Sequence, residues 1–278
     1  MEVKYFSSYK DGELAKIQEM ELGILKEFSR ICSKHNLEWI AIGGTALGTV
    51  RHSGFIPWDD DIDVAMRRMD YEKFIQVAKK ELSEEYFLQN FVTESICNNY
   101  FTKIRKNGTL FVEQCGKNIK MHQGIFMDIF PLDNLPQDKK KAEKFHYRVF
   151  FWYQLYMAKT TIAPATQLTN GKRRMVILGR AILHAALHIV PKKYLFNKVD
   201  RIFQKYNRED TGMIGFVYLR GMSLKLTEFY PIRKMIFENM EINMPNDYDT
   251  YLKRDYGDYM RIPEEGKRVN HRPVILKL

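Results

Sequence analysis

The sequence predicts an α+β protein, in which a mixed sheet with flanking helices forms a core that carries a helical annex. Between Leu14 and Cys32 the apolar residues recur every three or four positions, which is typical of an amphipathic helix. Several short segments rich in β-branched and aromatic residues follow, bounded by Gly, Pro and Asp. From about Asp138 to Asn207 helical patterns dominate. A hydrophobic content of 45% suffices for a packed core and argues against an intrinsically disordered chain.

The first elements surround a glycine pair. We expect residues 37–42 to form a buried strand that stops at Gly43 and Gly44, and residues 45–50 to form one short helix. Pro57 excludes a helix interior in the next segment. Residues 61–66 alternate Asp, Ile, Asp, Val, Ala and Met, which predicts a strand.

Further strands complete the predicted sheet. Asp70 is expected to cap the N-terminus of a helix that runs through Leu82. The remaining apolar, β-rich pieces that suit strands lie at residues 86–92, 100–104, 109–112 and 124–130.

The loop at residues 160–171 is the expected boundary between core and annex, because it contains Pro, Thr and Asn and interrupts two helical patterns. The expected division is a core over residues 1–160, a helical annex over residues 161–210, and a segment over residues 211–278 that completes the core and the active site. No regular structure can be assigned to residues 245–278 from their pattern.

Composition restricts the compartment and the partners. A net charge of +10 attracts phosphates, nucleic acid or anionic lipid, but the basic residues are dispersed among acids and match no nucleic-acid motif, so we expect no nucleic-acid partner. Cys32, Cys97 and Cys115 fit neither a disulfide framework nor a zinc site, which favours a reducing cytoplasm. No apolar leader and no apolar run of about 20 residues is visible, so we expect a cytoplasmic protein, soluble or peripheral at a membrane.

The densest chemical signal lies between Gly43 and Asp63. Alternate side chains of a strand share a face, so Asp61 and Asp63 are expected to project together. Two adjacent carboxylates repel each other, and a divalent cation removes this repulsion. An all-oxygen site suits Mg²⁺ or Mn²⁺, which commonly link protein carboxylates to substrate phosphates.

The residues before this pair are candidates for phosphate contacts. Gly43 and Gly44 lack a Cβ, so a phosphate can approach the backbone, and a helix that starts near Thr45 directs its positive end at that anion. Arg51 can bind a phosphate in bidentate fashion, and His52 can donate to a phosphate oxygen or move a proton. Taken singly, an acidic run is usually a solvated loop, a glycine pair a turn and a histidine a surface residue. Their occurrence together favours a phosphate and metal site.

The same residues resemble a known family. Gly-Gly-Thr at 43–45, Leu-Gly at 47–48, Val-Arg-His at 50–52 and Gly-Phe-Ile-Pro-Trp-Asp-Asp-Asp-Ile-Asp at 54–63 look like the signature of the LicD family, which is related to the fukutin-related proteins. Residues 124–133 resemble the family's second motif, and residues around 251–263 its C-terminal one. The resemblance spans most of the chain and is weakest in the helical middle. It implies a core like that of nucleotidyltransferases.

The resemblance also implies a third carboxylate on a neighbouring strand, which is Asp128. Alternation puts Asp128 on the face of Phe126 and Phe130, where an unpaired charge is costly. Asp128 is then either a third metal ligand or a base for the acceptor hydroxyl, and pairing with a lysine is the purely structural alternative. The expected metal ligands are Asp61, Asp63 and Asp128.

The implied activity is that of a metal-dependent phosphotransferase, with Mg²⁺ or Mn²⁺ as cofactor. It would move a phosphocholine-like group from a CDP-linked alcohol donor to a hydroxyl of a cell-surface glycan acceptor or its lipid-linked precursor, and release CMP. The alternative is a nucleotidyltransferase that moves NMP from an NTP to a small molecule or protein. Tyr256, Asp258 and Tyr259 either line the donor base or pack against the sheet, and Asp133 is expected in a turn.

A hydrophobic helix is expected at residues 175–190, between two short basic stretches. Arg180, His184 and His188 stand four apart and share one face, while the rest of the helix surface is almost wholly apolar. Such a helix suits the interface of an anionic membrane, where a lipid-linked acceptor would be met at the inner face of the cell membrane. The alternative is a buried helix that packs on the core. A metal site at the two histidines is the least favoured interpretation.

Overall fold

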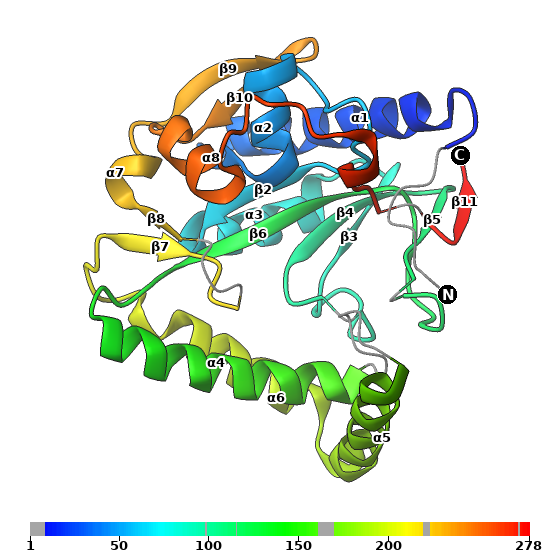
Figure 1. The fold of residues 1–278 in the computed structure, drawn as a ribbon, viewed down its shortest axis with the longest axis vertical. Coiled ribbons are helices and arrows are strands. Elements are labelled where there is room, and N and C mark those ends of the chain that lie inside the picture. The colour runs from blue at the N-terminus through cyan, green and yellow to red at the C-terminus, as the bar shows by residue number, and fades with distance from the viewer. Residues whose placement is uncertain (1–8, 98, 115, 161–169, 219–222, 272) are drawn as a thin grey trace.

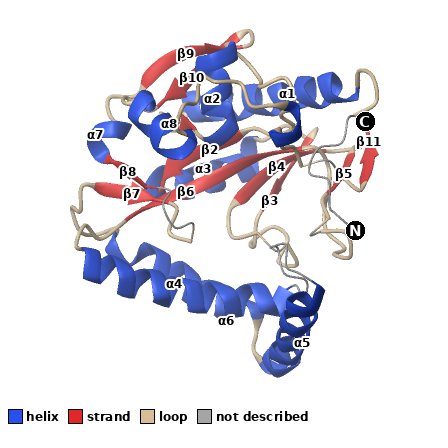
Figure 2. Ribbon diagram, viewed as in Figure 1, coloured by secondary structure: helices blue, strands red, loops and turns tan. Residues whose placement is uncertain are grey.

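A mixed sheet forms the centre of the protein (Figure 1 and Figure 2), for which a computed structural model describes residues 9–97, 99–114, 116–160, 170–218, 223–271 and 273–278. The strand order is β1-β2-β6-β4-β3, and β7 and β8 extend the sheet from the C-terminal end of β6. β2 and β6 run parallel, and the other pairs are antiparallel. The strands are β1 (Ile40–Ala41), β2 (Asp63–Arg67), β3 (Tyr86–Gln89), β4 (Thr102–Lys106), β6 (Phe126–Asn134), β7 (Met213–Gly215) and β8 (Ser223–Lys225). The predicted α+β class with a mixed sheet is confirmed.

Two helices pack side by side against the sheet. α1 (Glu13–Lys34) contacts β4 and β6, and α3 (Arg68–Glu81) contacts β2, β6 and α1. Phe28 of α1 anchors this layer, with its ring centroid 5.2 Å from that of Trp39 and 4.9 Å from that of Phe74, both in edge-on geometry. The predicted amphipathic helix is confirmed by the buried residues of α1, which are Ile17, Glu21, Ile24, Leu25, Phe28, Ile31 and Cys32.

A second group of elements lies beside β1. α2 (Gly43–His52) contacts β2, β9 and α8, while β10 contacts β1. The other members are α7 (Leu226–Phe229), the hairpin β9 (Arg233–Phe237) and β10 (Met240–Met244), and α8 (Tyr248–Tyr256). The 3₁₀ turn η3 (Glu265–Lys267) follows α8 in the chain, and β5 (Leu110–Val112) forms a separate two-stranded pair with β11 (Ile275–Lys277). Residues 245–278, to which the sequence pattern assigned no regular structure, are therefore regular in part. α8 is short, and only two of its residues are buried, so it leaves little apolar periodicity to detect.

Helices form a layer beneath the sheet in Figure 1, and they dominate residues 138–207 as predicted. α4 contacts both α5 and α6, and the loop between β3 and β4 adds Phe91 and Tyr100 to their apolar core. Residues 161–169, where the expected boundary falls, lie outside the described residues. The elements of this helical layer are α4 (Lys139–Thr160), α5 (Asn170–Ala186), the 3₁₀ turn η1 (Leu187–Ile189), α6 (Lys192–Phe203) and the 3₁₀ turn η2 (Gln204–Tyr206).

The glycine pair lies inside a helix and not in a turn. The strand expected at residues 37–42 is reduced to β1, which has two residues. α2 then starts at Gly43 and not at Thr45. Gly43 itself adopts a φ of 56° and donates its N–H to the hydroxyl of Tyr251 at 2.8 Å. A positive φ of this kind favours glycine. The short helix expected at residues 45–50 therefore exists and extends in both directions.

β2 begins later than the sequence indicates. The alternation at residues 61–66 predicts a strand from Asp61, but β2 starts at Asp63, so Asp61 precedes it. The loop before β2 is held by Asp60, whose buried carboxylate accepts the backbone N–H of His271 at 2.8 Å. This contact with a distant residue draws the chain away from the sheet. The alternation of residues 61–66 cannot reveal it, because that pattern reflects only neighbours in the sequence.

Two acidic residues take roles other than those expected. Arg67 occupies the N-cap of α3, because β2 passes directly into the helix, and Asp70 lies in the first turn, where the helix dipole favours an acid. Asp133 belongs to β6 and not to a turn, and it is 1% exposed. Its carboxylate accepts two hydrogen bonds from Arg68 and one from the amide of Asn207 at 2.6 Å. The buried ion pair between Asp133 and Arg68 therefore joins β6 to α3.

Replacing Asp133 with Ala is expected to lower the free energy of unfolding by about 3 kcal/mol, because it removes the closest carboxylate from the buried Arg68. Arg68 would keep two weaker partners, the hydroxyl of Tyr100 at 3.3 Å and the carboxylate of Asp200 at 3.6 Å. Urea unfolding followed by circular dichroism measures the change. The exposed Asp210→Ala is the matched control, with an expected effect within about 0.5 kcal/mol. A loss below about 1 kcal/mol for Asp133→Ala would show that the pair does not hold β6 to α3.

Candidate active site

Parallel pairing of β2 and β6 sets two carboxylates side by side. Asp63 on β2 is the register partner of Asp128 on β6, and residues in register share a face of the sheet. Lys103 on β4 is the partner of Asp128 on the other side. Its Nζ lies 2.8 Å from Asp128 Oδ1 and 3.4 Å from the ring centroid of Phe126. Asp63, Asp128 and Lys103 thus lie in a row across three strands of the sheet. Pairing of Asp128 with a lysine, one of the alternatives considered from the sequence, is therefore present.

The loop before β2 adds Asp59, Asp60 and Asp61. Asp60 is fully buried and accepts hydrogen bonds from the hydroxyl of Tyr9 and from the backbone N–H of His271. The Nδ1 of His271 lies 3.3 Å from Asp60 Oδ1 and 3.3 Å from Asp61 Oδ2. Hydrogen bonding to Asp60, followed by the charge of Asp61, raises the pKa of His271 against the opposing effect of burial. An imidazolium at this position therefore partly neutralises the loop.

Asp59 and Asp63 lie against the first residues of α2. A Cβ on Gly44 would overlap Asp59 Oδ2, and one on Gly43 would stand 3.1 Å from Asp63 Oδ2. The Oγ1 of Thr45 accepts the backbone N–H of Asp63 at 2.8 Å. The space beside the glycines is therefore occupied by protein carboxylates, whereas a phosphate was expected there from the sequence.

The start of α2 also offers backbone donors. The first hydrogen bond inside the helix is donated by Ala46, and the N–H of Gly43 is taken by Tyr251. The N–H groups of Gly44 and Thr45 have no acceptor within the helix, because the first turn of a helix supplies none. Together with the positive end of the helix dipole, these groups suit an anion.

Glu21 joins the carboxylates from α1, and sequence analysis missed it. The side chain is fully buried, and neither of its carboxylate oxygens has a hydrogen-bond partner among the described residues. Burial raises the pKa of Glu21, and the charge of Asp61 is the next cause. A signal was available, because Glu21 interrupts an apolar stripe at the helical spacing of Ile17 and Leu25. The acidic cluster comprises Glu21, Asp59, Asp60, Asp61, Asp63 and Asp128.

Burial and mutual repulsion raise the pKa of most carboxylates in the acidic cluster. For Asp63 the causes of the raised pKa are burial, then the charge of Asp61, then that of Asp128. Burial is also the largest cause for the raised pKa of Asp59, followed by Asp61. Burial raises the pKa of Asp128 to about 6, although Lys103 opposes this shift. The negative charge therefore exceeds what the nearby cations neutralise.

The acidic cluster fits a hard divalent cation by its chemistry. Its donors are oxygens, and a bound cation would remove the repulsion that raises their pKa values. The predicted ligands Asp61, Asp63 and Asp128 do not bring three ligand atoms within 4.8 Å of one another. Across the described part of the chain, Asp60, Asp61 and His271 do so. Binding of one cation by the predicted set therefore requires these side chains to move closer together.

Arg51 and His52 lie at the other end of α2. At about 1.5 Å per residue, His52 is about 13 Å from Gly43 along the helix axis. Burial, then the charge of Arg51, lowers the pKa of His52. The Nη1 of Arg51 donates to the carbonyl of Tyr259 at 2.9 Å, and the charge of Asp59 opposes the lowering of the Arg51 pKa by burial. The start of α2, and not its end, meets the acidic cluster.

The segment of residues 257–271, here the C-terminal segment, is bound by residues of the sequence signature. The ring centroid of Trp58 lies 4.5 Å from the guanidinium carbon of Arg268. Asp60 accepts the N–H of His271, as described, and the arginine of α2 binds two carbonyls of the segment. Part of the signature therefore serves to fix the C-terminal segment over the loop before β2.

The two tyrosines of the C-terminal motif differ in exposure. Tyr259 is 8% exposed and donates its hydroxyl to Asp249 at 2.8 Å, so it packs as one of the two sequence-based alternatives predicts. Tyr256 is 44% exposed. Burial is the largest cause of its raised pKa, and the charges of Asp59 and Asp63 contribute. Tyr256 therefore borders the acidic cluster and remains available to a ligand.

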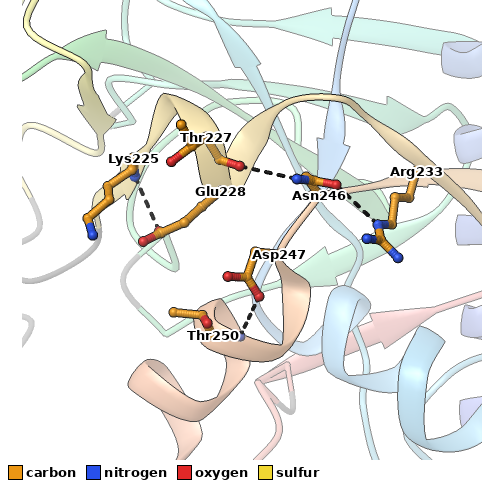
Figure 3. A pocket seen from close by; sticks show the side chains of 7 residues that line it. All are labelled: Lys225, Thr227, Glu228, Arg233, Asn246, Asp247 and Thr250. Atoms are coloured by element: carbon orange, nitrogen blue, oxygen red, sulfur yellow. Dashed lines mark hydrogen bonds between the residues drawn. The ribbon is translucent and has the colours of Figure 1, made fainter.

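A pocket of ≈ 460 Å³ opens between α7, β9 and the start of α8 (Figure 3). Asn246 accepts from Arg233 Nε at 3.2 Å and donates to the carbonyl of Thr227 at 3.3 Å. The backbone N–H of Lys225 donates to Glu228 at 3.2 Å. None of the residues that line this pocket belongs to the acidic cluster, and their polar groups largely satisfy one another. The pocket is therefore separate from the candidate site.

The fold and the acidic cluster define a class of α+β proteins whose carboxylate site faces a helix N-terminus. A family model described as LicD/FKTN/FKRP, nucleotidyltransferase domain, matches residues 36–177, which contain every member of the cluster except Glu21. The lipopolysaccharide cholinephosphotransferase LicD of Haemophilus influenzae is 30% identical over 267 residues, which cover 90% of this chain and 92% of that protein. Uncharacterized proteins of Rickettsia typhi and Rickettsia prowazekii are 37% and 38% identical over 54 and 47 residues, 19% and 17% of this chain and 18% of each of theirs. The chain belongs to the LicD family.

In the absence of divalent cations, the acidic cluster should make the free energy of unfolding fall as the pH rises. Because the pKa values are raised, the folded chain holds protons that the unfolded chain releases. The stability that these protons provide at low pH is lost as the pH rises through the pKa values of the folded chain; for Asp128 this pKa is about 6. Asp63→Asn removes one such group. Its melting temperature should match that of the wild type near about pH 4 and exceed it increasingly toward about pH 8.

Differential scanning fluorimetry in EDTA measures this difference, with Asp210→Asn as the control that should show none. Mg²⁺ or Mn²⁺ should raise the melting temperature of the wild type at about pH 8 more than that of Asp63→Asn. A difference between wild type and Asp63→Asn that stays constant with pH would contradict the repulsion.

Proposed function

We propose that this chain is a phosphotransferase that moves a phosphocholine-like group from a CDP-linked alcohol to a hydroxyl of a cell-surface glycan or its lipid-linked precursor, and releases CMP. The observation that carries the proposal is 30% identity, over 90% of the chain, to a relative named as a lipopolysaccharide cholinephosphotransferase. The acidic cluster supports it, because carboxylates beside a helix N-terminus suit the handling of phosphate groups.

The start of α2 is the proposed binding site for the donor diphosphate. Gly44 and Thr45 contribute N–H groups that no acceptor within the helix uses. The carboxylates of Asp63 and Asp59 lie beside Gly43 and Gly44, so a diphosphate bound here would share the site with them, and a divalent cation would reduce the repulsion between these anions. Tyr256, which is 44% exposed at the edge of the acidic cluster, is available to line the nucleoside.

Asp61, Asp63 and Asp128 would hold Mg²⁺ or Mn²⁺. The cation, when bound, would neutralise the phosphate oxygens and stabilise the departing CMP. Lys103 keeps the carboxylate of Asp128 in place through its contact at 2.8 Å. Glu21 contributes a further unpaired carboxylate behind this set.

The reaction itself is a displacement at phosphorus. The oxygen of the acceptor hydroxyl forms a bond to the β-phosphorus of the donor, the bond from that phosphorus to the bridging oxygen breaks, and CMP leaves with the electron pair. Asp128 serves either as the third ligand or as the base that takes the hydroxyl proton. A pKa of about 6 suits a base near neutral pH, where such a group typically contributes about 10² to 10⁴ in rate.

We place the reaction at the cytoplasmic face of the cell membrane. Nucleotide-linked donors and lipid-linked acceptors are both accessible there. Cys32 and Cys97, which are buried free thiols, agree with a reducing compartment.

The alternative function is transfer of NMP from an NTP to a small molecule or protein. It is favoured by one observation, the description of the matched domain as a nucleotidyltransferase domain. The two reactions leave different products, because a CDP-linked donor yields CMP whereas an NTP yields pyrophosphate.

Among CDP-choline, CDP-ethanolamine, CDP-glycerol and CDP-ribitol, we expect CDP-choline to support the fastest release of CMP in the presence of Mg²⁺ and a lipopolysaccharide acceptor. Chromatography of the nucleotides measures it. A parallel assay with the four NTPs should release no pyrophosphate. Pyrophosphate from an NTP, without CMP from any of the four donors, would favour the alternative function.

Asp61→Asn, Asp63→Asn and Asp128→Ala should each reduce kcat by about 100-fold or more, because each removes a charge from one functional unit. The triple variant should be little worse than any single one, since members of such a unit act together. Asp210→Asn is the control and should retain full activity. Full turnover by Asp61→Asn or Asp63→Asn at saturating Mg²⁺, with a melting temperature no lower than that of the wild type, would remove that residue from the site.

A further inference from the structure

α5 and η1 present apolar side chains to the solvent. Met175, Leu178, Ile182 and Ile189 are 71%, 63%, 64% and 88% exposed. They follow one another at steps of three, four and seven residues, so they lie along one side of the helix. These four side chains are here termed the apolar face.

Two polar residues of α5, Arg180 and His184, contact α4. Arg180 Nη1 donates to Gln154 Oε1 at 3.3 Å, and His184 Nδ1 lies 2.9 Å from the carbonyl oxygen of Ala158, both on α4. Leu187 of η1 is buried. A helix at a water-facing surface normally buries its apolar side and exposes its polar side. α5 has the opposite arrangement, so the expectation of a helix buried against the core is wrong for the apolar face.

Positive charge is concentrated in the same helical layer. Residues 139–206 contain fifteen Lys and Arg and two acidic residues, Glu143 and Asp200. The excess of thirteen is larger than the net charge of +10 for the whole chain, so acidic residues outnumber basic ones elsewhere. On α4, Lys140 and Lys144 are exposed at a spacing of one helical turn.

We propose that the apolar face docks in the plane of an anionic lipid bilayer. A bilayer offers an apolar interior to the face and negative headgroups to the basic layer around it. A second copy of the chain fits less well, because the helical layer around its apolar face carries the same excess of positive charge, so the two helical layers would repel each other. The docking does not depend on the transfer reaction, so either proposal can fail without the other.

The helix lies on the bilayer and does not cross it. Among the described residues no single helix is long and apolar enough to span a membrane, although Met175–Ile189 and Lys192–Tyr206 together pass that test on length and composition. These two pieces meet at an angle of 104°. The apolar residues of the second piece, Leu195, Val199, Ile202 and Phe203, are buried in the core of the helical layer. They are therefore not free to enter lipid.

Flotation of the full chain with vesicles tests the proposal. The protein should float with phosphatidylcholine vesicles that contain about one third phosphatidylglycerol, and the bound fraction should fall as NaCl rises from about 50 to about 500 mM. Vesicles of pure phosphatidylcholine should bind far less. The double variant Leu178→Ser, Ile182→Ser should lower the partition coefficient by about tenfold or more.

Matched controls separate docking from folding. Ile236→Ser with Ile262→Ser removes two apolar side chains that are each 54% exposed outside the helical layer, and this variant should bind as the wild type does. Both double variants should keep the wild-type melting temperature, because the altered side chains are exposed. In a second measurement, the fluorescence of Ile182→Trp should be quenched by bromine-labelled lipid, whereas that of Ile236→Trp should not.

Three results would overturn the proposal. One is the absence of flotation with anionic vesicles at low salt. Another is equal flotation of the wild type and the Leu178→Ser, Ile182→Ser variant. The third is a dimer, seen by analytical ultracentrifugation, which the same variant abolishes while neither protein binds vesicles. That result would assign the apolar face to a second copy of the chain.

Discussion

Mutual repulsion among buried carboxylates is the constraint that the core of this protein has to meet. The acidic cluster brings together side chains from α1, the loop before β2, β2 itself and β6, and burial raises the pKa of several of them. Positive groups reach it from three directions, with Lys103 on β4, the N-terminal end of α2 and His271 in the C-terminal segment. The parallel pairing of β2 with β6 sets Asp63 beside Asp128 and so adds to the repulsion. The antiparallel pairing of β4 with β6 and the glycine start of α2 each bring a compensating group close.

The chain divides its charge between two regions with different partners. The helical layer holds most of the excess positive charge, whereas the remainder of the chain is slightly acidic. An anionic ligand of the acidic cluster would therefore gain little from the bulk charge of the core and would depend on local groups such as the N-terminus of α2. The layer, by contrast, attracts anionic surfaces over a longer range. A single value of +10 for the protein conceals this division.

Local patterns predicted the features that depend on neighbours in the sequence. The spacing of Ile17 and Phe28 predicted α1, and the motif between Gly43 and Asp63 predicted a helix followed by a strand. The helix begins two residues before its predicted start, and the strand begins two residues after its own. Contacts between distant residues could not be derived in this way. The pairing of Lys103 with Asp128 depends on strand register, and the contact that moves Asp61 out of β2 comes from more than 200 residues further along the chain. Glu21 was overlooked because the periodicity of α1 tolerates a single charged residue.

The contact between Asp60 and His271 also has a consequence for biosynthesis. Ribosomes release a chain from its N-terminus, and domains begin to fold while the remainder is still being made. Asp60 and Trp58 are translated more than 200 residues before their partners His271 and Arg268. A nascent chain can therefore assemble β2, β6 and α1 around carboxylates whose histidine partner does not yet exist. Until translation reaches that histidine, cytosolic cations or protons have to shield this loop in its place.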